Sequence, residues 1–110
     1  MAILEPFNEY DVSAGDTGGL YVVTPGITSV SFQFISTSFD MAGALVSVFE
    51  SNVLDDNYFI QVGQSGLPIT VSMGDEVNII TIPVVSAKYY KAMFVANAVT
   101  SGTLSVYVSW

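Results

Sequence analysis

Apolar and polar side chains alternate along residues 27–36, and this two-residue period restricts the segment to β-structure. One face of the segment collects bulky apolar side chains, namely Val30, Phe32 and Phe34. The other face collects small or uncharged polar side chains, namely Ser29, Ser31 and Gln33. Such a pattern is typical of a strand with one face in a core and the other outside it.

The same pattern recurs along the chain, and Gly, Pro, Asn and Asp separate the segments. The predicted strands are residues 18–24, 27–36, 43–50, 58–62, 67–73, 76–82, 88–96 and 103–110. In two of them one face is clearly apolar. It consists of Tyr90, Ala92, Phe94 and Ala96 in residues 88–96, and of Leu104, Val106, Val108 and Trp110 in residues 103–110. The pair Gly74-Asp75 has the form of a hairpin turn between residues 67–73 and 76–82. We therefore predict an all-β fold, a single antiparallel β-sandwich of about eight strands, of which a jelly roll is the favoured form.

The chain has 110 residues, which is the length of one domain. Residues 1–17 mix apolar side chains, including Phe7 and Tyr10, with Glu and Asp. We predict that they form an extended arm or edge strand, ordered against a sheet edge or a neighbouring subunit. Residues 18–110 then make up the sandwich domain.

Composition excludes most chemistry. The chain has no His, no Cys and only two Lys or Arg residues, against ten Asp or Glu, for a net charge of −8. A catalytic triad cannot be built without His or Cys, so we expect no enzyme activity and no cofactor. Clustered positive charge is also missing, so we expect no nucleic-acid partner. Residues 92–110 are uncharged, but they are rich in β-forming residues and interrupted at 100–103, so we expect no membrane insertion.

Two binding alternatives remain open at this stage. The acidic run Asp55-Asp56-Asn57 offers oxygen ligands for Ca²⁺, although it lacks the spaced acidic pattern of a calcium loop. An exposed pair of aromatic rings, Trp110 with Tyr107 or Tyr58, would make a platform for a sugar. The alternative function is therefore a carbohydrate-binding β-sandwich module.

The outward positions of the predicted strands carry Ser, Thr and apolar side chains where free monomers usually carry Lys and Glu. This favours a surface that other subunits cover. The candidate interface residues are aromatic or long side chains on the arm and on the last two strands: Phe7, Tyr10, Tyr89, Lys91 and Trp110.

Three short motifs add a resemblance. They are SNVLDDNYF at residues 51–59, KYYK at residues 88–91 and a TSGT hairpin at residues 100–103 that leads into the last strand. With them, residues 46–110 resemble a module of small jelly-roll virion proteins of phages, found as capsid vertex, decoration, head-fibre or tail proteins. The resemblance implies a non-enzymatic building block that assembles about a symmetry axis, as a trimer or pentamer, with other capsid proteins. It also implies a location in the virion after synthesis in the host cytoplasm, and the sequence MAILEPFNEYD shows no export signal.

Overall fold

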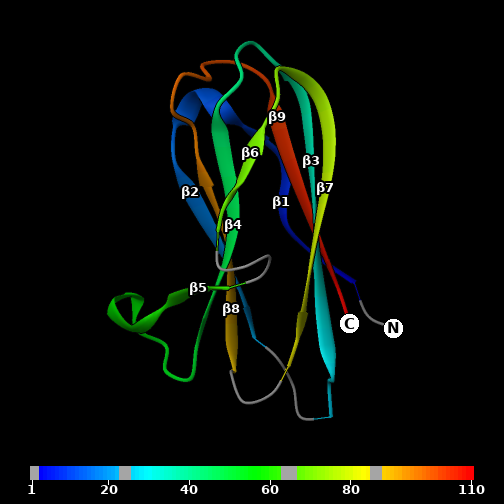
Figure 1. Cartoon of the computed structure of the whole chain (residues 1–110), viewed down its shortest axis with the longest axis vertical. Helices are drawn as coiled ribbons and strands as arrows, with labels where there is room; N and C mark the ends of the chain where they lie inside the picture. The colour runs from blue at the N-terminus through cyan, green and yellow to red at the C-terminus, as the bar shows by residue number, and fades with distance from the viewer. Residues whose placement is uncertain (1–2, 23–25, 63–66, 85–87) are drawn as a thin grey trace.

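The computed structural model describes residues 3–22, 26–62, 67–84 and 88–110. Within these ranges the chain forms nine β-strands in two antiparallel sheets that pack face to face, together with two short 3-10 helices (Figure 1). The predicted all-β sandwich is confirmed. The ninth strand is Ile3–Asp11, which lies in the segment predicted as an extended arm or edge strand, before the first of the eight predicted strands.

Each sheet has a simple order. The first sheet runs β1 (Ile3–Asp11), β9 (Thr103–Ser109), β3 (Ser29–Phe39) and β7 (Gly74–Pro83). The second runs β2 (Thr17–Val22), β8 (Tyr89–Val95), β4 (Ala44–Ser51) and β5 (Ile60–Val62), and β6 (Ile69–Val71) also pairs with β4. The 3-10 helices are η1 (Val12–Ala14) and η2 (Asp56–Tyr58).

The strand pairs are nested. The first strand pairs with the last, β2 with β8, β3 with β7, and β4 with β5 and β6 between them. A long hairpin of strands that is folded over into two sheets gives this nesting, and it is the topology of a jelly roll. Most connections therefore cross from one sheet to the other, and the turns between strands bridge the two layers.

The alternation seen in the sequence places the core. The buried side chains include Val30, Phe32 and Phe34 in β3, Tyr90, Ala92 and Phe94 in β8, and Leu104, Val106 and Val108 in β9. All of these predicted inner faces are confirmed. Trp110 is half-buried and packs against the margin of this core, with its ring centroid 4.7 Å from that of Tyr21.

The predicted hairpin at Gly74-Asp75 is wrong, because the two segments belong to different sheets. Residues 69–71 pair with β4, whereas Gly74 begins β7 and lies opposite Phe39 of β3. The Asp75 carboxylate accepts a hydrogen bond from the backbone N–H of Ser38 at 2.8 Å, which holds the start of β7 to the end of β3. The crossing between the sheets therefore occurs just before Gly74, whose φ of +87° suits glycine.

The expected hairpin at residues 100–103 is also wrong, because β8 and β9 lie in different sheets. Here the Asp40 carboxylate accepts bonds from the Thr100 N–H at 2.8 Å, the Thr100 hydroxyl at 2.6 Å and the Ser101 N–H at 3.1 Å. The Thr100 bonds hold the pKa of Asp40 below its ordinary value. A Cβ at Gly102 would lie 2.8 Å from the Thr37 carbonyl oxygen, so only glycine fits this crossing.

Residues 3–11 form the edge strand β1, which pairs with β9 and adds to the sandwich. Two β-bulges interrupt the pairing of β1 with β9. At the second bulge, an advance of three residues from Phe7 to Tyr10 in β1 matches an advance of two residues from Val106 to Leu104 in β9. Because of the extra residue, Phe7 and Tyr10 both reach the core side despite their odd spacing. Among the described residues, no helix has the length and apolar character that crossing a membrane requires.

Candidate functional site

The segment from Ser51 to Ile60, which we call the β4–β5 corner, departs most from the compact sandwich. The chain leaves β4 at Ser51, makes the turn η2 and returns as β5, which pairs with the end of β4. The corner extends to one side of the two sheets (Figure 1). It contains SNVLDDNYF, one of the three motifs that carry the sequence resemblance.

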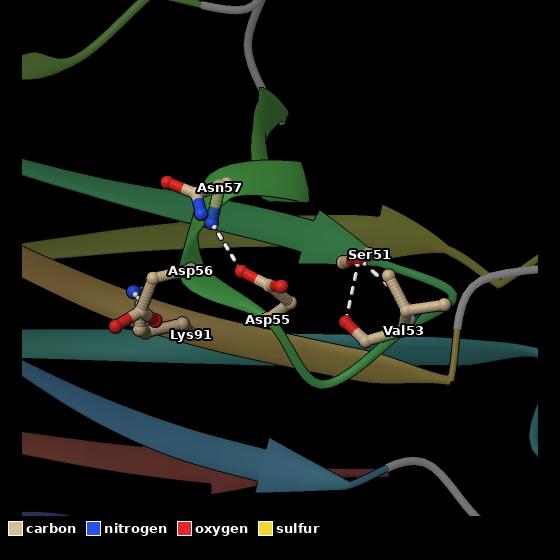
Figure 2. Close-up of polar contacts among 6 residues, drawn as sticks. All are labelled: Ser51, Val53, Asp55, Asp56, Asn57 and Lys91. Atoms are coloured by element: carbon tan, nitrogen blue, oxygen red, sulfur yellow. Dashed lines mark hydrogen bonds and ion pairs between the residues drawn. The ribbon is translucent and has the colours of Figure 1, made fainter.

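Local polar bonds fix the shape of the corner (Figure 2). The Ser51 hydroxyl donates to the Val53 carbonyl at 2.7 Å and accepts from the Val53 N–H at 3.1 Å. The Asp55 carboxylate accepts from the Asn57 N–H at 3.0 Å and so caps the first turn of η2. These short-range bonds satisfy backbone groups that the turn would otherwise leave open, so the Ser51 and Asp55 side chains have a structural role.

Lys91 joins the corner to the sheet beneath it. Its Nζ lies 2.9 Å from the Asp56 carboxylate and 4.8 Å from the centre of the Phe59 ring, so it makes an ion pair and a cation–π contact at once. Lys91 belongs to β8, opposite Phe49 of β4 on the outer face of the second sheet. Two contacts from one side chain therefore hold the corner against the sandwich.

On this polar frame the corner exposes large apolar side chains. Their exposed fractions lie between 49% and 64%, for Val53, Leu54, Tyr58 and Ile60. Elsewhere, among residues 7–19, 21, 22, 26–62, 67–84 and 88–110, only six further large apolar side chains are exposed, and these are spread over several elements. Exposed apolar surface gathered on one segment is typical of a contact with another protein.

The five interface residues predicted from the sequence lie in different places. Phe7 is 7% exposed and belongs to the core, and the Tyr10 hydroxyl donates to the Gly15 carbonyl at 2.7 Å. Trp110 lies at the core margin beside Tyr21. Only Tyr89 and Lys91, both half-buried, occupy the outer face of β8 near the corner: Tyr89 is opposite Ser51.

The sequence reading missed Leu54 and Ile60. A signal was present, because Val53-Leu54 is an apolar pair inside a segment otherwise read as a polar connection. An apolar pair in a connection has no strand periodicity to explain it, and it therefore marks either local packing or an external contact. In the structure the Val53 and Leu54 side chains are both exposed, which favours the external contact.

The aromatic residues considered for a sugar platform do not share one surface. Tyr107 and Trp110 are an odd number of residues apart, so their side chains point to opposite faces of the sheet. Tyr107 lies on the outer face and Trp110 packs against the core. Tyr58 lies on the corner, in another part of the fold. The close ring pairs seen in the described part of the chain all include a core residue, such as Tyr21 with Trp110 or Phe39 with Phe94.

The acidic run does not gather into a metal site. Asp55 and Asp56 point to different partners, Asn57 and Lys91, as Figure 2 shows. Across the described residues, no three acidic, His or Cys side chains converge as metal ligands would. The arrangement is one of turn capping and ion pairing.

Comparison with known proteins gives a fold and no family. No protein-family model matches the chain, and no curated protein matches it. Among solved structures, tripeptidyl peptidase 2 matches 96% of this chain with a TM-score of 0.59 and 14% identity, over 9% of its own length. The likeness to this much larger protein shows the β-sandwich fold alone.

Two weaker structural matches were found. A carbohydrate-binding module, CBM4, matches 83% of this chain with a TM-score of 0.48 and 11% identity. The enzymatically active domain of tailspike protein 4 of bacteriophage CBA120 matches 84% with a TM-score of 0.46 and 14% identity. The chain spans 56% of the first protein's length and 13% of the second's.

Proposed function

We propose that this protein is a non-enzymatic structural component of a phage virion. In this proposal it assembles as a trimer or pentamer about a symmetry axis, in or on the capsid, as a vertex or decoration protein. The observation that carries the proposal is the β4–β5 corner, where exposed Leu54 and Ile60 sit on a frame held by Ser51, Asp55 and Lys91. A projection with an apolar surface suits a repeated contact between identical subunits.

The charge distribution supports an assembling surface. Strands β3 and β9, which form the middle of the first sheet, contain no charged residue. Their outer side chains are hydroxyls, an amide and apolar groups, and the Ser31 and Thr81 hydroxyls hydrogen-bond to each other at 2.8 Å across the sheet. Interface centres are depleted in charge in the same way. The resemblance of residues 46–110 to phage virion modules points to the particle in which this assembly would occur.

The test combines solution mass with two matched double variants. Light scattering should give a trimer or pentamer, or a whole multiple of one, for the unaltered protein. The double variant Leu54→Ser with Ile60→Ser should lower the mass to smaller species, because it removes apolar contact area from the corner. The control is Val22→Ser with Met41→Ser, which changes two apolar side chains elsewhere that are 50% and 48% exposed. It should leave the mass unchanged.

Thermal melting of both double variants separates loss of assembly from loss of fold. Because all four side chains are exposed, both variants should keep the circular dichroism spectrum of the unaltered protein. A second experiment looks for the protein in purified virus particles by mass spectrometry. A strict monomer that is also absent from such particles would refute the proposed function.

A further inference from the structure

Strand β7 is an open edge of the first sheet. It pairs with β3 along almost its whole length, from Gly74 opposite Phe39 to Pro83 opposite Ser29. Within the part of the chain that the structure describes, no strand pairs with its other side, and β7 is the outermost strand there (Figure 1). Its free side therefore presents a row of backbone donors and acceptors over ten residues.

The middle of β7 lacks the usual protection of an edge. Native edges are blunted by Lys, by inward charges, by bulges or by proline. In β7 the charges Asp75 and Glu76 stand at the start and Pro83 at the end, and the six residues between 76 and 83 are uncharged. Their pairing with β3 is regular, and on the outer face Val77 and Ile79 are 56% and 53% exposed.

We infer that β7 pairs with β7 of a second copy of this chain, antiparallel and about a two-fold axis at Ile79. Such pairing would join two four-stranded sheets into one continuous sheet of eight strands. A two-fold contact uses the same surface on both subunits, which fits an edge that is regular and self-similar in its middle. This contact is additional to the proposed ring assembly and does not depend on it.

The charges select the antiparallel orientation. In a parallel, in-register pair, Asp75 and Glu76 would each face their own copies, and like charges directly opposite destabilise a sheet. In the antiparallel pair centred on Ile79, Asp75 lies opposite Pro83 of the second copy and Glu76 opposite Ile82. The outer face then brings Val77 beside Thr81 and Ile79 beside Ile79, which are β-branched cross-strand pairs.

The other edge of this sheet is a poorer partner for β7. Strand β1 carries the exposed residues Glu9 and Asp11, and its two bulges break the straight ladder that β7 would need. Pairing between β7 and β1 of another copy would also be head-to-tail, because the two surfaces differ, and it would close only if the rotation between copies completes a ring. A two-fold pair of β7 strands closes after two subunits.

Single cysteines test both the contact and its register, because the natural chain contains none. Directly opposed residues in an antiparallel pair have Cα atoms about 4.5–5.5 Å apart, which is within disulfide reach. Ile79→Cys should therefore form a covalent dimer under mild oxidation. Val77→Cys alone should not, because its two copies are displaced by four residues, or about 13 Å at about 3.3 Å per residue.

A mixture of Val77→Cys and Thr81→Cys should restore cross-linking, since these positions face each other in the proposed register. As a non-covalent check, Ile79→Lys should lower the solution mass by separating the pair, because two lysines would then be directly opposed. The control Thr70→Lys puts the same charge on an exposed β-branched position of β6, in the other sheet, and should not change the mass.

The outcomes are distinct. Equal cross-linking of Ile79→Cys, Val77→Cys and Thr81→Cys would indicate parallel pairing or random collision, and absence of cross-linking in all of them would exclude the contact. Either result overturns the inference. The proposed function is tested separately by the Leu54→Ser and Ile60→Ser double variant: if that variant loses assembly while the cysteine pattern is absent, only the β7 inference fails. If the cysteine pattern is present while the corner variant assembles normally, only the corner contact fails.

Discussion

The two edges of the sheet β1-β9-β3-β7 differ in regularity and in charge. At one edge, β1 is interrupted by two bulges, and Glu9 adopts a φ of +50° at the second of them. At the other edge, β7 pairs regularly with β3, and its six central residues carry no charge. Both strands belong to one sheet of one small domain, so the difference is not a consequence of fold class.

The bulges explain how the β1 edge is closed. Each inserts one extra residue, and together they turn Phe7 and Tyr10 toward the core. The ring of Tyr10 lies 6.0 Å from that of Phe7 and 6.3 Å from that of Phe94, so β1 is tied to both sheets. The bulged backbone of β1, whose Phe7 and Tyr10 side chains pack into the core, does not offer another strand a regular row of backbone donors and acceptors. The regular backbone of β7 does.

The largest difference should appear when one side chain at each edge is truncated. Phe7→Ala should cost about 3–5 kcal/mol of unfolding free energy, because it leaves a cavity under β1. Val77→Ala, on the exposed face of β7, should change that energy by less than about 0.5 kcal/mol. Urea unfolding of the two variants measures both values at a concentration where the protein is monomeric. Similar losses at the two sites would remove the distinction between a closed and an open edge.

The next largest effect is expected at Trp110, which directly follows β9, the strand that pairs with β1. Trp110→Ala should cost about 2 kcal/mol, less than for a fully buried ring, because the indole is half-buried. Trp110→Phe should lose less, since a ring remains against Tyr21, 4.7 Å away between centroids. As the single Trp of the chain, it should show fluorescence between the buried and the water-exposed limits, with partial quenching. Emission identical to that of free indole would contradict the packing.

A smaller effect, dependent on pH, should appear at the start of β7. The Glu76 carboxylate accepts from the Asn78 side-chain amide at 2.9 Å and from the Ser72 N–H at 3.2 Å. The Asn78 bond is the main reason that the pKa of Glu76 lies below its ordinary value of 4.5. Because the folded pKa is the lower one, this contribution to stability is present above pH 4.5 and is lost as the pH falls through the folded pKa.

Glu76→Gln should therefore lose less stability than the unaltered protein on acidification below pH 4.5. The carboxylate is only partly buried, so solvent screening keeps the effect below that at Trp110. Urea unfolding over a series of pH values measures the two slopes. Asn78→Ala, which removes the main donor, should flatten the slope in the same direction. Parallel curves for all three proteins would show that Glu76 is not tied to the fold in this way.

The sequence predicted the elements whose side chains alternate. In β3, β8 and β9 a two-residue period separates an inner face from an outer one, and the buried residues follow it. In β1 the core side chains Phe7 and Tyr10 are three residues apart because of the bulge, and no strand period reveals them. The sequence therefore left open whether residues 1–17 are an arm or an edge strand.

The sequence could not assign strands to sheets. Gly74-Asp75 is a common hairpin pair, but the Asp75 carboxylate binds the Ser38 N–H, which lies far away in the chain. The candidate site had a similar limit. The polar residues of the corner were visible as a motif, whereas the exposure of Leu54 depends on where the corner projects from the finished sandwich. Both features are set by long-range packing.

The smallest expected effect concerns the bulge that closes β1. A non-glycine residue in the left-handed region costs about 1–2 kcal/mol, and glycine in place of another residue costs about 0.5–1 kcal/mol of chain entropy. Glu9→Gly should therefore stabilise the fold by about 0.5 kcal/mol. The backbone N–H of residue 9 keeps its bond to the Ser105 hydroxyl, at 3.0 Å, so the bulge should persist.

The control is Asn97→Gly, which has the same φ of +50°. Asn97 tolerates this conformation better than Glu, and its amide donates to the Gly43 carbonyl at 2.8 Å, so the substitution should be neutral or destabilising. Thermal melting of both variants measures the contrast. The solution mass of Glu9→Gly then separates the effect of the bulges from that of the Glu9 charge. An unchanged mass means that the bulges alone keep this edge from pairing. A higher mass means that the Glu9 charge is needed as well.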